Sequence, residues 1–180
     1  DPSASRLAHT LVGQAEGQAQ WVNDTAWLPG DRLAAVGNDL TLRIWDAAAG
    51  RQLSVLHGHT GSVTCVAASP DGRRLYTGAG DGTVRAWDLE ALDPARWVWP
   101  LGANGFGLAF APDGARAAGT GWEGWVRVWD AATGREIANW QGHEQSGVRV
   151  AWGPDGKWLA TTGNDGRVVL WDAATGQLKA

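Results

Sequence analysis

The chain has 180 residues, of which 44% are apolar and 13 are tryptophan, enough to build the core of a single domain spanning residues 1–180. Its formal net charge is −4, and its 15 Lys and Arg residues are scattered singly, which argues against nucleic acid as a partner. The sequence has no run of about 18 apolar residues and no basic-then-apolar start, so it predicts neither a membrane span nor a signal peptide. The single Cys65 excludes an internal disulfide framework and favours a reducing, cytoplasmic location.

A Trp-Asp pair recurs at a spacing of 42 residues and closes each time a short run rich in Val, Ile, Leu and Arg. The four pairs are Trp45-Asp46, Trp87-Asp88, Trp129-Asp130 and Trp171-Asp172. Self-similarity at a fixed period of this length indicates one supersecondary unit that is repeated along the chain.

The second copy of the repeat shows what the unit contains. Its short β-branched and apolar runs alternate with Gly-rich turns, so that strands are predicted over 63–69, 75–79, 83–88 and 96–101, with turns at 70–72 and 80–82. No segment has a sustained helical period. The fold class predicted is therefore all-β, built from four-stranded antiparallel sheets that must stack because one sheet alone cannot bury both of its faces.

Taken in chain order, the sheets begin with a spare strand and end with an incomplete one. An apolar run at 7–12 precedes Gly13 and is predicted to be an outer strand whose own sheet lacks its first three strands. Four sheets then follow, at about 21–57, 63–101, 106–141 and 148–180. The last has no room for a full outer strand.

These repeats resemble the WD-repeat family of β-propellers, of the bacterial type. The resemblance covers nearly the whole chain and rests on the Trp-Asp ends, on Gly58-His59 and Gly142-His143, and on the Pro-Asp-Gly turns at 70–72, 112–114 and 154–156. It implies four blades, half of an eight-bladed ring, and a non-enzymatic platform for protein–protein interaction. Bacterial members often accompany a signalling kinase or a nucleotide-driven switch domain.

The family is known for a hydrogen-bonded tetrad inside a blade, and two copies of the repeat carry all four members. These are His59, Thr77, Asp81 and Trp87, and His143, Thr161, Asp165 and Trp171. The tetrad also makes physical sense by itself, because a buried imidazole, carboxylate and indole N–H each need a partner. The other two copies depart from the pattern, with Gln18, Ala35, Asp39 and Trp45 in the first and Leu101, Gly119, Glu123 and Trp129 in the third.

In a propeller, the loop before the first strand and the loop between the second and third strands open on one face. The residues predicted to form a partner-binding face there are Trp21, Asn38, Ser62, Asn104, Trp122, Trp125, Gln145 and Asn164. Trp122 stands where the other copies have Asn38, Gly80 and Asn164, and Trp beside polar residues is typical of an interface hot spot. The alternative is that Trp122 or Trp125 fills the space of the missing tetrad.

A second hypothesis is a hydrolase or lyase that uses the central channel. Asp24, Cys65, Gly107 and Arg149 share one register of the innermost strands and are placed to face that channel. His59 with Asp81 could also act as a base-orienting dyad, although the repeat register favours a structural network. His57 and His59 are the only close pair of metal-ligand type, so no metal and no cofactor are predicted.

Assembly follows from the number of blades. Trp27, Ala68, Phe110 and Trp152 share a register that is predicted to pack between blades. Four blades leave two apolar faces open, and a second copy placed head to tail would cover both, each spare strand at 7–12 completing the last blade of the other copy. The competing reading is a fragment of a larger signalling or regulatory WD-repeat protein.

Overall fold

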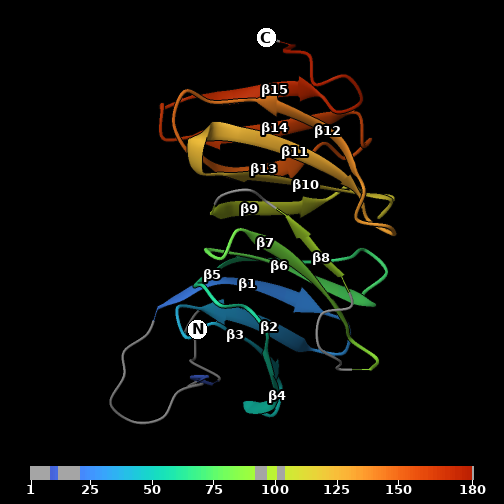
Figure 1. Cartoon of the computed structure of the whole chain (residues 1–180). Helices are drawn as coiled ribbons and strands as arrows, with labels where there is room; N and C mark the ends of the chain where they lie inside the picture. The colour runs from blue at the N-terminus through green and yellow to red at the C-terminus, as the bar shows by residue number, and fades with distance from the viewer. Residues whose placement is uncertain (1–8, 12–20, 92–96, 101–103, 180) are drawn as a thin grey trace, which may run out of the picture.

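The computed structural model describes residues 9–11, 21–91, 97–100 and 104–179. Within these residues the chain forms four antiparallel sheets, called blades 1 to 4, which stand side by side in sequence order (Figure 1). Their strands in blades 1 and 2 are β1 Val22–Leu28, β2 Arg32–Gly37, β3 Thr41–Asp46, β4 Arg51–His57, β5 Val63–Ala68, β6 Arg74–Ala79, β7 Thr83–Asp88 and β8 Trp97–Pro100. Those in blades 3 and 4 are β9 Gly105–Phe110, β10 Arg116–Gly121, β11 Trp125–Asp130, β12 Glu136–Gln141, β13 Gly147–Trp152, β14 Trp158–Gly163 and β15 Val168–Asp172.

Blade 4 has three strands rather than four. Beyond β15, an isolated bridge joins Trp171 to Leu178, and the Lys179 N–H donates to the Leu170 carbonyl at 3.0 Å. The strand predicted over 7–12 falls mostly outside the described residues. Residues 9–11 are described and carry no strand; instead, the His9 Nε2 atom lies 3.0 Å from the Ala48 carbonyl oxygen of blade 1.

The two residues of each Trp-Asp pair have different structural roles. In blade 3 the Asp130 carboxylate accepts hydrogen bonds from the Thr133 hydroxyl at 2.7 Å and the Thr133 N–H at 2.8 Å, which closes the turn into β12. Trp129 beside it is fully buried between blades. Because successive side chains of a strand face opposite ways, one dipeptide fixes both a turn and a core contact.

Three hydrophobic layers hold the blades together, and each has its own composition. The layer between blades 1 and 2 is mainly aliphatic, with Val36, Leu42, Ile44, Val63 and Leu75. The layer between blades 2 and 3 is aromatic, with Tyr76, Trp99, Phe110, Trp125 and Trp129. The layer between blades 3 and 4 mixes Val128, Val150 and Leu159 with Trp140 and Trp171.

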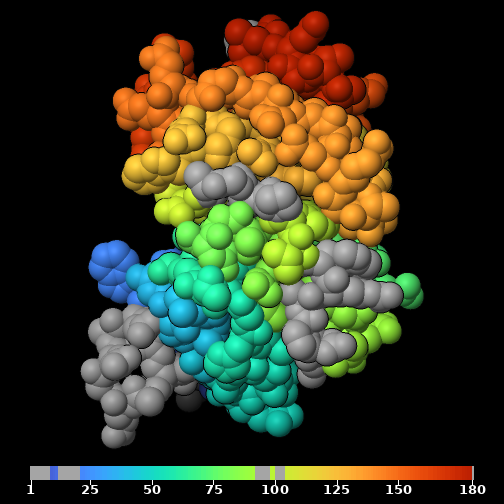
Figure 2. Space-filling model, viewed as in Figure 1, coloured from blue at the N-terminus to red at the C-terminus, as the bar shows by residue number. Residues whose placement is uncertain are grey.

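Each end blade has exposed apolar side chains on the face that turns away from the other described blades. On blade 1 the Trp27 side chain is 67% exposed, and on blade 4 Val168 and Leu170 are 71% and 42% exposed. The prediction that Trp27 packs between blades is therefore wrong within the described residues, which form no blade before blade 1. The other members of its register, Ala68, Phe110 and Trp152, do pack in the three layers. Blades 1 and 4 lie at opposite ends of the stack (Figure 2).

Each innermost strand contains an irregularity at the same point. The pairing register shifts between Val22 and Asp24 in blade 1, between Val63 and Cys65 in blade 2, and at the matching places in blades 3 and 4. Such a bulge places one extra residue in the strand and re-aims its side chain. The extra residues reach the next blade: Asn23 Nδ2 donates to the Val63 carbonyl at 2.8 Å, and the Thr64 hydroxyl donates to the Gly105 carbonyl.

The surroundings of Gly124 show how closely blades 3 and 4 approach each other. Its φ of 76° is left-handed, and an added Cβ would overlap the carbonyl oxygens of His143 and Gln145. Gly166 has the same φ, 77°, with open space around it. Gly166→Ala should therefore cost about 1 kcal/mol of unfolding free energy from backbone strain alone. Gly124→Ala should cost about 3 kcal/mol, because overlap adds to strain.

Chemical denaturation of the two variants beside the parent chain measures this difference. Equal losses of unfolding free energy for Gly124→Ala and Gly166→Ala would contradict the close approach of the two blades at Gly124.

Candidate interaction face

The loops predicted to share one face are tied together in the same way in every blade. The loop between the second and third strands donates a backbone hydrogen bond to the loop before the first strand. These bonds run from Asn38 to Trp21 at 3.0 Å, Gly80 to Ser62 at 2.8 Å, Trp122 to Asn104 at 2.8 Å and Asn164 to Ser146 at 2.9 Å. Since the four blades stand side by side, the four loop pairs form one continuous surface, called here the loop face. Ser62 is half-buried in it, while Asn38, Asn104, Gln145 and Asn164 are exposed.

Trp122 is the largest exposed side chain on blade 3 of the loop face. It begins a 3₁₀ turn, Trp122–Gly124, in which Glu123 and Gly124 both have positive φ. The ring is 54% exposed, and its centroid lies 6.2 Å from that of Phe106. The Gln141 side chain donates to the Glu123 carbonyl and, at 2.7 Å, to the His143 carbonyl, which anchors the turn to blade 4. Trp122 is thus held in place by its backbone while most of its ring meets solvent.

Trp125 was expected on the same face and is buried instead, with 7% of its surface exposed. It belongs to the aromatic layer between blades 2 and 3, and an added Cβ on Gly121 would overlap its ring. The Arg127 guanidinium lies 5.2 Å from the centre of that ring. Of the two tryptophans, Trp125 is therefore the one that fills space inside blade 3, and Trp122 is the one that faces outward.

In blade 2 the four predicted tetrad residues meet in one chain of hydrogen bonds. The Trp87 indole N–H donates to the Thr77 hydroxyl oxygen at 2.8 Å, and that hydroxyl lies 2.7 Å from His59 Nε2. On the other side of the ring, His59 Nδ1 lies 2.8 Å from the Asp81 carboxylate. The donors and acceptors match only when Nδ1 carries the proton and Nε2 accepts from Thr77. A neutral imidazole therefore satisfies every member.

Blade 4 repeats this arrangement with His143, Thr161, Asp165 and Trp171. The His143 Nε2–Thr161 Oγ1 and Trp171 Nε1–Thr161 Oγ1 distances are both 2.8 Å, and His143 Nδ1 lies 3.0 Å from Asp165. Both histidines are buried. The His59–Asp81 pair therefore lies inside the fold, where it joins strands, and not in a cleft that a substrate could enter.

Blades 1 and 3 solve the same packing problem differently. In blade 1, Asp39 turns to Arg43 at 2.8 Å and to the Thr41 hydroxyl at 2.8 Å. In blade 3, Gly119 stands where blades 2 and 4 have threonine, and the Trp129 ring packs directly on it. Gln18 and Leu101, the counterparts of the tetrad histidines, lie outside the described residues.

The residues proposed for a channel site lie near one another, but each has a structural environment. Cys65 is 2% exposed, and burial raises the pKa of its thiol to about 11, so at neutral pH it is a protonated core residue rather than a nucleophile. The Asp24 carboxylate accepts from the Val66 N–H at 3.1 Å, and Arg149 donates to the Phe106 carbonyl at 2.6 Å. Both side chains thus join neighbouring blades. The four residues do share one register, as predicted, each directly after a bulge.

Comparison with known families decides the architecture. A model of the WD domain, G-beta repeat, matches residues 6–46, 50–88, 106–130 and 134–172, which together make up most of the chain. The chain belongs to the WD-repeat family. Its four sheets are the blades of a WD-repeat β-propeller, and proteins of this family generally act as non-enzymatic platforms for protein–protein interaction.

Several WD-repeat relatives are similar to short parts of the chain. Rat (Rattus norvegicus) Coronin-7 is 46% identical over 55 residues, which cover 31% of this chain and 6% of that protein. Angio-associated migratory cell protein from Homo sapiens is 47% identical over 58 residues, covering 30% and 13%. Ribosome assembly protein 4 from Chaetomium thermophilum is 41% identical over 73 residues, covering 41% and 14%.

The matched stretches are thus a small part of each relative. All three relatives are eukaryotic, so a bacterial type gains no support from them. Within the described part of this WD-repeat chain, no helix is long and apolar enough to cross a membrane, and no three His, Cys, Asp or Glu side chains gather as metal ligands.

The tetrad of blade 2 predicts a large difference between two carboxylate deletions. Asp81→Ala leaves the buried His59 without its acceptor and should cost about 2 to 4 kcal/mol of unfolding free energy. Glu123→Ala, the matched change in blade 3, should cost much less because Glu123 is exposed and no histidine network depends on it. Thermal or chemical unfolding compares the two variants. Equal shifts would show that the blade 2 network does not stabilise the fold.

The same network predicts how stability depends on pH. Burial lowers the pKa of His59, and its hydrogen bond to Asp81 offsets only part of that effect. Burial acts to raise the pKa of Asp81, but hydrogen bonds from Thr83, Thr60 and His59 outweigh it and lower that pKa. In both cases the unfolded chain binds the proton more readily, so stability is lost as the pH falls. For His59 the loss begins near its unfolded pKa of about 6.5, and for Asp81 near about 3.9.

A His59→Gln variant isolates the histidine contribution, because His143 is the same in both proteins. The parent chain should be more stable than the variant at pH 7.5. This advantage should shrink by up to about 1.4 kcal/mol for each pH unit below 6.5. Urea unfolding at pH 7.5 and 5.5 measures it. An advantage that grows toward pH 5.5 would mean that the folded state holds His59 charged.

Proposed function

We propose that this chain is a non-enzymatic, cytoplasmic scaffold whose loop face binds a protein or peptide around Trp122. The observation that carries the proposal is a tryptophan more than half exposed on a turn that is anchored from two sides. Family membership supports the general function, and Trp122 supports the place.

The physical argument starts from the cost of binding. Ordering a flexible side chain at an interface costs free energy, whereas an aromatic ring on a fixed backbone loses little freedom. Trp122 offers such a ring, and Phe106 lies next to it. Asn104 and Gln145, both exposed on the loop face, provide polar groups at the rim. An aromatic centre with a polar rim is the arrangement that concentrates binding energy in protein interfaces.

We also propose that the scaffold associates with itself head to tail, so that two copies form an eight-bladed ring. Support comes from the exposed Trp27 of blade 1, from the exposed Val168 and Leu170 of blade 4, and from the β15 edge, which residues 178 and 179 pair with only at Leu170 and Trp171. In this arrangement the segment at 7–12 of each copy pairs with β15 of the other. The alternative is that further blades of a longer signalling or regulatory chain cover the same faces.

Peptide selection tests the binding site with no assumption about the sequence of the partner. A displayed random peptide library is selected on the immobilised 180-residue chain, and the affinities of enriched peptides are measured by calorimetry. Trp122→Ala should weaken binding by roughly 30-fold, the effect of losing an interface hot spot. Ile137→Ala is the matched control, because Ile137 is an exposed apolar residue on the outer strand β12.

The outcomes separate clearly. Peptides that lose affinity for Trp122→Ala but not for Ile137→Ala place the binding site on the loop face. If no peptide is enriched, or if enriched peptides bind Trp122→Ala as they bind the parent chain, the site is wrong.

A further inference from the structure

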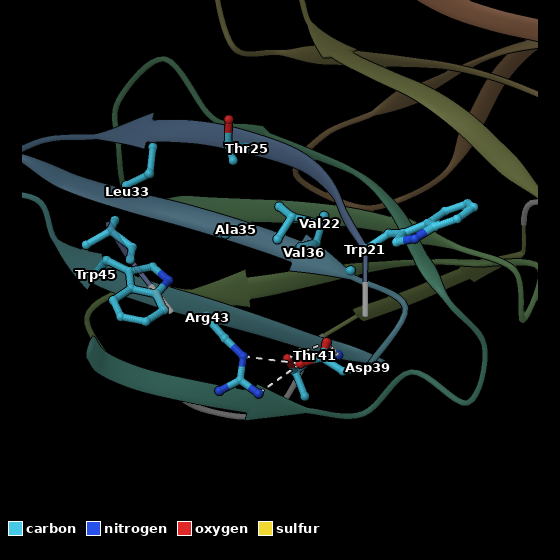
Figure 3. A pocket seen from close by; sticks show the side chains of 12 residues that line it. Trp21, Val22, Thr25, Leu33, Ala35, Val36, Asp39, Thr41, Arg43 and Trp45 are labelled. Carbon is cyan, nitrogen blue, oxygen red and sulfur yellow. Dashed lines mark hydrogen bonds and ion pairs between the residues drawn. The ribbon is translucent and has the colours of Figure 1, made fainter. Parts of the chain in front are cut away.

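The face of blade 1 that turns away from blade 2 contains a hollow of about 210 Å³. This face is partly covered, since Trp45 and Thr41 in the lining are buried, while Trp27 is exposed. The hollow is lined by residues of β1, β2 and β3, among them Leu33, Arg43 and Trp45, and by Leu11. Figure 3 shows Trp45, Arg43 and Asp39 following one another along one side of it. Trp27 lies on the same strand as Thr25, with its ring exposed.

The other blades show what covers this surface when a neighbour is present. Trp152 occupies in blade 4 the register that Trp27 occupies in blade 1. Its indole N–H donates to the Ala109 carbonyl of blade 3 at 3.2 Å, and the Arg116 guanidinium lies 4.7 Å over the ring. Trp27 is the only other tryptophan at this register, and within the described residues its indole N–H has no acceptor. Trp27 therefore occupies a position that packs between blades elsewhere in the chain, but its own side chain is exposed.

The uncovered face of blade 4 presents the complementary half. Val168 and Leu170 are mostly exposed there. The residues at the same two positions of the other blades are fully buried against the next blade. They are Leu42 and Ile44 in blade 1, Val84 and Ala86 in blade 2, and Val126 and Val128 in blade 3. In three interfaces out of three, these positions pack on the tryptophan-bearing face of the following blade. Among the described residues no blade follows blade 4, so Val168 and Leu170 have no such partner there.

We propose that blade 4 of one copy packs on blade 1 of a second copy of this chain, with Trp27 as the anchor of the contact. By the register of the internal interface, the Trp27 indole N–H donates to the carbonyl of Ala151 in the other copy, since Ala151 follows Ala109 by one repeat and is exposed. Trp158 lies one repeat after Arg116. In the contact between copies it therefore faces the Trp27 ring, as Arg116 faces the Trp152 ring within one chain. This deepens the proposed self-association, on which it rests, by naming the surfaces and the anchor.

The symmetry of the contact decides the form of the assembly. A head-to-tail contact between identical chains closes into a ring if its rotation divides the full turn, and otherwise grows into a fibre. If four blades span half a turn, two copies close with two identical interfaces. Eight blades lie within the range in which propellers are found.

Light scattering on the 180-residue chain across a concentration series tests the contact. The parent chain should have twice the monomer mass of 19.0 kDa. Trp27→Ala should weaken the dimer by about 30-fold or more, as loss of a hot spot does. Leu170→Glu, at the opposite face, should also give a monomer. Both residues are exposed in one copy, so both variants should keep the melting temperature of the isolated chain. Trp122→Ala is the matched control and should remain a dimer.

Mixing the two monomeric variants distinguishes the orientation. The Trp27→Ala chain keeps an intact blade 4 and the Leu170→Glu chain keeps an intact blade 1, so the mixture should recover dimers through one good interface. Dimers lost in Trp27→Ala but kept in Leu170→Glu would indicate head-to-head pairing and overturn the proposal. So would a parent chain that is monomeric, or one whose mass grows without limit. Each result leaves the peptide selection on Trp122 unaffected, so the two proposals can fail separately.

Discussion

A blade of this protein has two apolar faces and no way to cover either by itself. The whole structure depends on that constraint, because every blade must lie between two neighbours. The backbone meets it by repeating one register, whereas the side chains vary widely. Val36, Leu42 and Ile44 build an aliphatic layer, and Tyr76, Phe110 and Trp129 build an aromatic one on equivalent backbone. Between two blades, position in the repeat, rather than residue identity, therefore determines what is buried.

The tetrads show how a polar network can take part in such a core. From the Trp87 indole to the Asp81 carboxylate, each donor meets one acceptor, so the four side chains bury polar atoms without leaving one unmatched. Blade 3 fills the same interior space with aromatic side chains instead of a hydrogen-bonded network. Gly119 removes a side chain, Trp129 packs on the vacated backbone, and Trp125 covers the adjoining space. A hydrogen-bonded network and an aromatic cluster thus serve as alternative fillings of one site.

Much of this architecture can be predicted from the sequence. The 42-residue period and the Pro-Asp-Gly turns place nearly all the strands. The tetrad residues follow from the resemblance to the WD-repeat family, which His59 and Asp81 share with His143 and Asp165 two repeats later. What the sequence does not reveal is the bulge in each innermost strand. A bulge leaves no mark in the pattern of apolar residues, yet it turns Cys65 into the core and aims Thr64 at the next blade.

The tryptophans were harder to place for a related reason. Burial of a large aromatic residue depends on what stands opposite it, and a repeat pattern cannot tell an inner blade from an end blade. Trp27 is exposed because no described blade stands against its side of blade 1, although Trp152 at the same register is packed. Trp125 is buried because Gly121 leaves room for its ring, a fact about the neighbouring strand β10.

Trp27 and Trp122 have similar exposure and lie on surfaces with different roles in the fold. The Trp27 side chain lies on a face that every inner blade buries, so stacking with another blade covers it. Trp122 lies on the loop face, at a position that remains outside all three internal interfaces. Adding a blade at either end of the stack would leave it open. The proposed assembly and the proposed partner binding therefore use separate surfaces, so that a ring closed in this way would leave the loop face accessible.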